Sequence, residues 1–233
     1  MSHYEKAWQA VLQRIETAAQ ACGRAPSDVR LLAVSKTFPA DAVRAVHAAG
    51  QRAFGENYVQ EAAAKRAALA DLADVEWHLI GPLQSNKTAQ AAAAFDWVET
   101  VDRAKIAQRL SAQRPAEMPP LSLCIEVNVS GEASKSGVQP AEVLPLARAI
   151  AALPNLRLRG IMGIPAPSDD ASLVRSQFRA LRACFEACRA AGLAVDTLSM
   201  GMSADLELAV AEGATEVRVG TAIFGARRTA RAV

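Results

Sequence analysis

The chain has 233 residues, of which 51% are hydrophobic, 5% aromatic and 21% charged, and its formal net charge is +2. This length can bury one sizeable core, and the composition is that of a folded protein and not of a disordered one. The nearly neutral charge, without a basic stripe interleaved with aromatic residues, argues against a nucleic-acid partner.

Hydrophobic and cysteine patterns exclude further classes of protein. No run approaches the roughly 18 consecutive apolar residues of a membrane span, and the charged N-terminal segment does not resemble a signal peptide. The cysteines and histidines lack the spacing of disulfide frameworks or metal ligands, and Cys184 and Cys188 are expected to face a core from one helix. We therefore expect a cytoplasmic protein with no membrane partner and no structural metal.

Short β-branched segments alternate with alanine-rich amphipathic segments along the chain. The segments that predict strands cover residues 31–36, 52–57, 76–81, 97–101, 123–129, 158–164, 196–200 and 216–220. Helical patterns follow them, for example at residues 40–50 and 171–192, and an additional helix precedes the first strand. Strands alternating with helices predict a parallel sheet with right-handed crossovers. We predict an α/β protein with a single (β/α)8 TIM barrel over residues 1–233, and an open doubly wound sheet is the alternative.

In such a barrel, functional groups lie where the strands end and in the loops that follow. Lys36 ends the first predicted strand. Partial burial favours the neutral form of an amine, which is the form that attacks a carbonyl group to make a Schiff base. A structural lysine held by an ion pair is the alternative.

Two glycine-bearing turns follow the last two predicted strands, in the segments SMGMS (residues 199–203) and VGTAIFG (residues 219–225). Each turn precedes a helix, and unpaired N–H groups at the start of a helix attract anions. Either turn alone is consistent with an ordinary helix cap, whereas the pair predicts a phosphate site. With Lys36, the pair suggests a phosphorylated carbonyl compound, which is pyridoxal phosphate (PLP) or the sugar phosphate of a class I aldolase.

Arg218 precedes the second of these turns by two residues. Its guanidinium group could donate to the pyridine nitrogen of PLP. The alternative is an ion pair with Glu126 or Glu216.

Several long segments carry a resemblance to a known family: AVSKTFP, FGENYVQEAAAK, WHLIGPLQSNK, VNVSGEASKSG, RGIMGIP and LSMGMSADLELAVAEGATEVRVGTAIFGAR. Together they resemble the pyridoxal phosphate homeostasis protein family, also called the YggS/PROSC family, from about residue 5 to residue 228. The resemblance implies a TIM barrel of the alanine racemase N-terminal type that binds PLP.

The resemblance also implies roles for individual residues. Lys36 matches the lysine that forms the Schiff base with PLP, and Arg218 matches the arginine that faces the pyridine nitrogen. The remaining matches are one residue near the cofactor ring, Asn57, the phosphate-binding turn of Gly220 and Thr221, and a second phosphate loop with Ser199, Gly201 and Ser203.

In function, the resemblance implies a role in vitamin B6 homeostasis, and we predict a carrier or regulator of PLP, with PLP-dependent apo-enzymes as partners and no catalytic residues. A one-domain barrel with no obvious interface stripe predicts a monomer. A weak amino-acid racemase or Schiff-base aldolase is the alternative. The resemblance implies that a racemase of this fold would take a catalytic tyrosine from a separate β-domain of its partner subunit. The two tyrosines here, Tyr4 and Tyr58, are instead expected to pack or to face solvent. Lys87 and Lys135 follow predicted strands and could accept PLP during transfer, although we favour solvated loop lysines.

Overall fold

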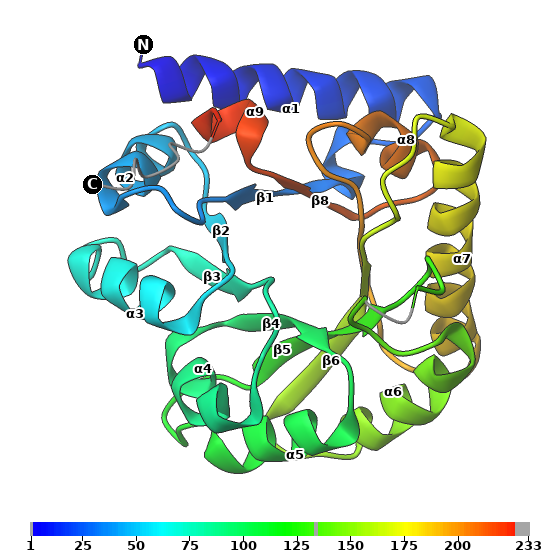
Figure 1. The fold of residues 1–233 in the computed structure, drawn as a ribbon. Coiled ribbons are helices and arrows are strands. Elements are labelled where there is room, and N and C mark those ends of the chain that lie inside the picture. The colour runs from blue at the N-terminus through cyan, green and yellow to red at the C-terminus, as the bar shows by residue number, and fades with distance from the viewer. Residues whose placement is uncertain (1, 133–134, 227–233) are drawn as a thin grey trace.

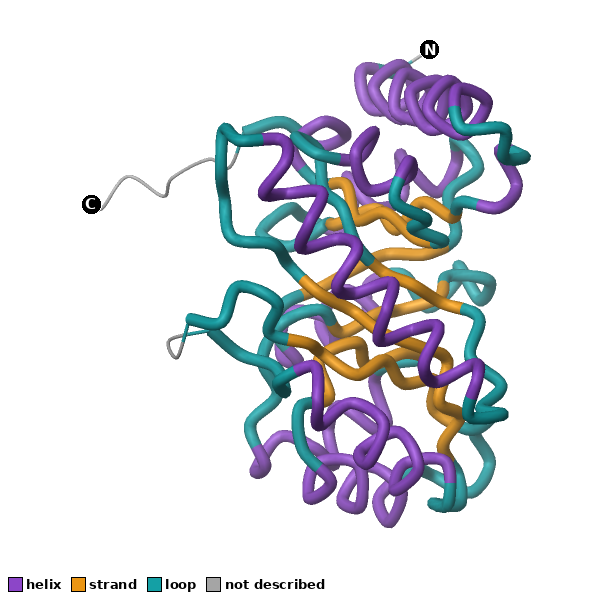
Figure 2. Tube along the Cα trace, turned by 90° about the vertical axis from the view of Figure 1, so that its right-hand side faces the viewer, coloured by secondary structure: helices purple, strands orange, loops and turns teal. Residues whose placement is uncertain are grey.

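The structure is a computed structural model that describes residues 2–132 and 135–226. Eight parallel strands form a closed barrel at its centre, with helices around the outside (Figures 1 and 2). The strands are β1 (Arg30–Val34), β2 (Ala53–Glu56), β3 (Glu76–Leu79), β4 (Trp97–Val101), β5 (Leu121–Val127), β6 (Leu156–Gly163), β7 (Thr197–Ser199) and β8 (Glu216–Val219).

The α-helices of the described residues are α1 (His3–Ala21), α2 (Ala40–Ala48), α3 (Val59–Ala68), α4 (Thr88–Ala94), α5 (Ala104–Gln113), α6 (Val143–Ala151), α7 (Ala171–Ala190), α8 (Leu206–Ala211) and α9 (Thr221–Phe224). Three short 3₁₀ turns accompany them, η1 (Pro26–Asp28), η2 (Ser85–Lys87) and η3 (Pro140–Glu142).

The pairing of the first strand with the last closes the barrel. Ala33 of β1 pairs with Phe54 of β2 on one side and with Val219 of β8 on the other. This confirms the predicted barrel over the open doubly wound sheet, which would leave two strand edges unpaired. Each predicted strand is present, although most end one or two residues earlier than predicted because the last residues belong to the loops of the barrel mouth.

The predicted additional helix is α1, which runs beside α8 and α9 on the outside of β1 and β8 (Figure 1). A capping box starts it, because the Ser2 hydroxyl accepts from the Glu5 N–H and the Glu5 carboxylate accepts from the Ser2 N–H. Val11 and Ile15 of its inner face are buried. Among the described residues, no helix combines the length and apolar character needed to cross a membrane.

The main core lies between the strands and the surrounding helices, where branched aliphatic and phenylalanine side chains are buried. Cys184 and Cys188 of α7 belong to it, as the sequence predicts. A second, smaller cluster consists of Trp97, Cys124 and Met162. Polar side chains lie next to this second cluster, and hydrogen bonds connect them to the candidate site described below.

Candidate functional site

A cavity of about 430 Å³ opens at the carboxyl ends of the strands. All eight strands or the loops that follow them contribute to its wall, which is the location that the barrel predicts. Its lining residues are Val34, Lys36, Asn57, Ile80, Gly81, Pro82, Thr100, Glu126, Ser136, Ile164, Met202, Ser203, Ala204, Arg218, Gly220 and Thr221. Six of the eight residues predicted for the site, Lys36, Asn57, Ser203, Arg218, Gly220 and Thr221, are therefore brought together in one cavity.

Lys36 and Asn57 lie on one side of this cavity, after β1 and β2. The half-buried Lys36 Nζ donates to Asn57 Oδ1 over 3.4 Å. Gly81 presses against the same loop, because a Cβ at this position would lie 2.2 Å from the Asn57 carbonyl oxygen. The loops after the first three strands thus hold the lysine and the amide in contact.

Arg218 lies on β8, the strand that pairs with β1, and is buried. Its guanidinium group donates to the Ser199 hydroxyl at 2.7 Å and to the Gly163 carbonyl oxygen at 2.9 Å. Among the described residues it forms no ion pair with Glu126 or Glu216, so the structure does not support that alternative for Arg218. The arginine is fixed by neutral groups and still lines the cavity.

Ser199 and Gly201, predicted for a phosphate loop, are buried behind the cavity wall and are not among its described lining residues. Both support Arg218, since Ser199 accepts from its side chain and the Gly201 carbonyl accepts from its backbone N–H at 2.9 Å. Gly201 has φ +92°, and a Cβ there would lie 2.4 Å from Ala209 Cβ. Ser203 does reach the cavity, and its hydroxyl accepts from the Ala222 N–H over 3.4 Å.

Behind Arg218, a chain of hydrogen bonds continues through the barrel interior. Ser199 donates to Glu99 Oε2 at 2.6 Å, and the other Glu99 oxygen lies 2.6 Å from His78 Nδ1. His78 Nε2 lies 2.7 Å from a Glu76 oxygen, and the imidazole stacks on Trp97 with centroids 4.9 Å apart. His78 is therefore a hydrogen-bonded histidine in the barrel interior.

The two carboxylates hold His78 as a cation. Burial alone would lower its pKa, but the hydrogen bonds to Glu76 and Glu99 outweigh burial and raise the pKa to about 9. Burial would likewise raise the pKa of Glu76, but His78 and Arg30 lower it to about 2. The pKa of Glu99 also falls, because His78 and the charge of Arg218 outweigh the burial of the carboxylate.

Glu216, at the start of β8, is a further acidic group in this interior. Both of its oxygens are buried without a hydrogen-bond partner among the described residues, and its nearest ion-pair contact is Arg30 Nε at 4.0 Å. Burial, together with the charge of Glu99, raises its pKa to about 7. Ligand atoms of Glu216, Glu99 and His78 lie within 4.8 Å of one another, so a metal bound here would compete with the proton on His78. The absence of a structural metal stays a prediction.

Glu126 of β5 lines the cavity itself, although the sequence pattern suggests it only as an ion-pair partner of Arg218. Burial raises the pKa of its carboxyl group to about 7, aided by the charge of Asp102 and opposed by that of Arg218. An acidic residue within an otherwise apolar predicted strand (residues 123–129) was the signal that could have identified it. The cavity therefore contains one acidic group that titrates near neutral pH.

The remaining candidate residues lie away from the cavity lining. Lys87 is half-buried at the end of η2 and Lys135 is exposed, and neither lines the cavity described here. Tyr58 is 60% exposed, and Tyr4 packs on Phe224 with ring centroids 6.0 Å apart. The two tyrosines face solvent or pack, as predicted.

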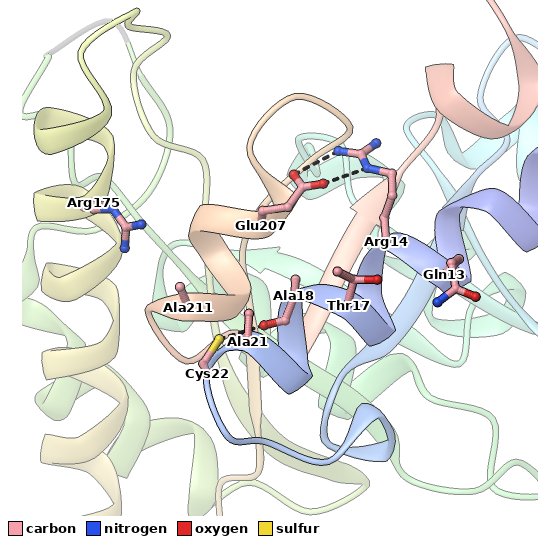
Figure 3. A pocket seen from close by; sticks show the side chains of 9 residues that line it. All are labelled: Gln13, Arg14, Thr17, Ala18, Ala21, Cys22, Arg175, Glu207 and Ala211. Atoms are coloured by element: carbon pink, nitrogen blue, oxygen red, sulfur yellow. Dashed lines mark hydrogen bonds and ion pairs between the residues drawn. The ribbon is translucent and has the colours of Figure 1, made fainter.

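A second cavity, of about 540 Å³, lies on the outside of the barrel between α1, α7 and α8 (Figure 3). Short side chains of α1 and α8 line most of it, and Arg14 at one edge donates to both oxygens of Glu207 at 2.7 and 2.9 Å. None of the predicted site residues lines it. The mouth cavity, where a primary amine, an arginine and two polar turns converge, is therefore the candidate site.

Comparisons with known proteins identify the class of barrel and the family of the chain. Residues 8–228 match the family described as "Alanine racemase, N-terminal domain", which is the class of barrel that the fold defines. The chain is 60% identical over 217 residues to a Pseudomonas aeruginosa protein named "Pyridoxal phosphate homeostasis protein", covering 93% of each chain. An Escherichia coli K12 protein of the same name is 52% identical over 219 residues, covering 93% of this chain and 94% of the other.

Among solved structures, PipY of Synechococcus elongatus with PLP bound is similar, with a TM-score of 0.80 and 42% identity. The match covers 91% of this chain and 100% of PipY. The chain belongs to the pyridoxal phosphate homeostasis protein family.

Proposed function

We propose that this chain binds PLP reversibly, through a Schiff base on Lys36, and serves vitamin B6 homeostasis as a carrier or regulator. The observation that carries the proposal is the placement of Lys36 and Arg218 on the wall of one cavity, together with the polar turns at Ser203 and Gly220. The relatives named for PLP homeostasis and the PLP-bound PipY structure support it. We further propose a cytoplasmic monomer that supplies apo-enzymes.

The residues of the cavity suit PLP in size and in charge. A volume of about 430 Å³ lies within the range of small-molecule sites. Hydroxyl groups of Ser203 and Thr221 are suited to a phosphate, and the Arg218 guanidinium is suited to the pyridine nitrogen. Lys36 supplies the amine that PLP requires for covalent binding.

The chemistry assigned to Lys36 is a reversible condensation. With PLP bound, the uncharged Lys36 amine would condense with the aldehyde carbon, so that a C=N bond would replace the C=O bond and one water molecule would leave. Addition of water releases the aldehyde by the reverse steps. Asn57 Oδ1, the acceptor of the Lys36 amine, orients the nitrogen before it reacts.

Arg218 disfavours turnover of a bound substrate. A guanidinium group has only N–H donors, so toward a pyridine nitrogen it acts as a donor and leaves that nitrogen without a proton. An unprotonated ring is a weaker electron sink than one paired with a carboxylate. A carrier therefore fits Arg218 better than an enzyme that stabilises carbanions.

A weak racemase or aldolase is the second candidate, and Glu126 is the observation that favours it. Its pKa of about 7 is suitable for an acid or base in the cavity. Chiral analysis of alanine and other amino acids after incubation with protein and PLP separates the two functions. Turnover that Lys36→Ala abolishes would replace the carrier with an enzyme.

Borohydride reduction tests the covalent link. We expect a visible-region absorption band in the PLP-loaded protein that borohydride removes, leaving a pyridoxyl group on the peptide that contains Lys36. Lys36→Ala should lose this adduct and retain part of the PLP affinity, because the residues assigned to the phosphate lie on other loops. Lys87→Ala and Lys135→Ala are the matched controls and should keep the adduct. An unchanged adduct in Lys36→Ala would reject the assignment.

Glu126 should make the affinity for the phosphorylated cofactor depend on pH. Below pH 7 the Glu126 carboxyl group is neutral, and above pH 7 it adds a negative charge to a cavity that holds a phosphate. Glu126→Gln should therefore bind pyridoxine 5′-phosphate about tenfold more tightly than wild type at pH 8, a difference of about 1.4 kcal/mol. The two proteins should agree at pH 5.5.

Titration calorimetry at both pH values measures this difference. The phosphate itself titrates near pH ~6, so the ratio between variant and wild type is the informative quantity. The exposed Glu142 provides the control substitution Glu142→Gln. Equal affinities of Glu126→Gln and wild type at pH 8 would show that Glu126 does not face the phosphate charge.

A further inference from the structure

The segment that carries Lys36 is held on both sides by a buried cluster of charges. Lys65 of α3 donates to the Ser35 carbonyl oxygen at 2.8 Å, and to Glu56 and Glu61 at 2.7 Å each. The Ser35 hydroxyl donates to the same Glu56 oxygen at 2.5 Å. One lysine and two glutamates thus fix the residue that precedes Lys36 in the chain.

The residue after Lys36 is held by the same cluster. The Thr37 N–H donates to Glu61 Oε1 at 2.6 Å, and Thr37 has φ +69°, in the left-handed region that costs energy for a residue with a branched Cβ. The Phe38 N–H donates to the Ser35 carbonyl oxygen at 3.1 Å and closes a turn around Lys36. The backbone is therefore kept in a conformation that it would not favour alone.

The burial of this cluster bears on what it contributes to the protein. The side chains of Lys65 and Glu56 are 7% and 0% exposed, and burial raises the pKa of Glu56 against the opposing effect of Lys65. A buried ion pair is often no more stabilising than apolar side chains of similar volume. Its direct bond to the Ser35 carbonyl is what apolar side chains could not provide.

The cluster also ties together the two residues that meet in the cavity. Glu56 is the last residue of β2 and is followed directly by Asn57, whose side chain accepts from Lys36. Anchoring Ser35 to Glu56 consequently fixes the start of one loop relative to the other. A shift of the segment from 35 to 37 would move the Lys36 amine relative to Asn57.

We propose that Lys65, with Glu56 and Glu61, is a positioning residue that holds the Lys36 amine in the orientation needed to form the Schiff base. This inference rests on the proposed function. The cluster acts through the backbone of Ser35 and Thr37 and does not touch the cofactor. It should therefore govern the covalent step and leave the binding of the phosphate unaffected.

Two ligands separate these steps. Pyridoxine 5′-phosphate has no aldehyde, so its affinity reports the non-covalent site, whereas borohydride trapping of bound PLP reports Lys36. We expect Lys65→Met and Glu61→Gln to lower the rate of trapping at saturating PLP by about tenfold or more, with unchanged affinity for pyridoxine 5′-phosphate. Lys105→Met, at an exposed position of α5, is the control and should match wild type.

Hydrogen exchange of the protein without ligand provides a readout independent of PLP. The Thr37 amide should exchange faster in Glu61→Gln and Lys65→Met, while the amides of β1 keep their protection. Adding Thr37→Gly to either variant should recover part of the trapping rate, because glycine adopts the positive φ without strain.

The outcomes are distinguishable. If wild type shows no adduct on Lys36, the proposed function fails before the cluster is tested. If wild type forms the adduct and both variants form it at the same rate, the positioning role is overturned. A parallel loss of pyridoxine 5′-phosphate affinity and trapping would assign the cluster to general stability and would also overturn it. Glu61 is 25% exposed, so Glu61→Gln remains available if Lys65→Met does not fold.

Discussion

Glu99→Ala is expected to lower the free energy of unfolding by about 3–5 kcal/mol, the cost of removing one member of a buried ion pair. Glu99 is fully buried, lies 2.6 Å from His78 Nδ1, and accepts from Ser199, which in turn accepts from Arg218. Its loss leaves the His78 and Arg218 cations without the negative charge between them. An unpaired charge in such surroundings is strongly unfavourable.

Urea unfolding at pH 7 measures this loss from the shift in midpoint at constant slope. Glu99→Gln keeps a hydrogen-bonding side chain of the same shape and should lose less, roughly 1–3 kcal/mol. Glu76→Gln is the matched control at the other side of His78, where the carboxylate is 35% exposed and water replaces part of the lost interaction. A Glu99→Ala variant as stable as Glu76→Gln would mean that the interior charges do not depend on Glu99.

The same substitution should weaken binding at the barrel mouth. Arg218 takes its orientation from Ser199 and Gly163, and Ser199 takes its own from Glu99. A guanidinium group that loses this support no longer presents a fixed set of donors to the cavity. The polar interior is thus continuous with the candidate site and keeps its one arginine in place.

The alternation of strand and helix patterns predicted a parallel sheet, and the β1–β8 pairing decided between the barrel and the open doubly wound sheet. Eight short apolar segments separated by helices match a parallel barrel, and the barrel places strand ends at one mouth. Lys36 and Gly220 were identified in this way, from their positions at the ends of predicted strands, and Arg218 from its place two residues before Gly220, whereas Asn57 was implied by the resemblance. The resemblance to a known family then assigned their individual roles.

Contacts between side chains across the barrel could not be predicted from the sequence. Ser199 was predicted for a phosphate loop, yet its hydroxyl donates to Glu99, which is 100 residues away in the chain. Which inward-facing side chains meet depends on the stagger of the strands, and no local pattern encodes it. An acidic residue inside the apolar segment WVETV was a signal that a buried partner exists, although not which one.

The stability of the protein should fall as pH rises from about 6.5 to 9, by about 3 kcal/mol from His78 alone, at about 1.4 kcal/mol for each pKa unit. The unfolded chain releases the imidazole proton near pH 6.5, whereas the folded protein retains it to about pH 9. The folded state therefore binds more protons in this range, and its stabilisation is complete below pH 6.5 and lost as pH passes 9.

Other interior groups change the stability of the protein in different pH ranges. Glu216, whose pKa is raised to about 7, favours the folded state below its unfolded value of 4.5 and loses this contribution as pH rises through 7. Glu76, whose pKa is lowered to about 2, contributes stability above pH 4.5 that is lost as pH falls toward 2. The interval from pH 7 to 9 is consequently the one in which His78 dominates.

Urea unfolding at pH 7, 8 and 9 in wild type and in His78→Gln measures the contribution of this single imidazole. Glutamine keeps a donor for Glu99 and cannot take up a proton, so the decline between pH 7 and 9 should become shallower in the variant. His47→Gln is the same substitution at an imidazole outside the barrel interior, beside Asp74, and provides the comparison. If stability falls with pH equally steeply in wild type and His78→Gln, His78 is neutral in the folded barrel. Glu76 and Glu99 then do not raise its pKa.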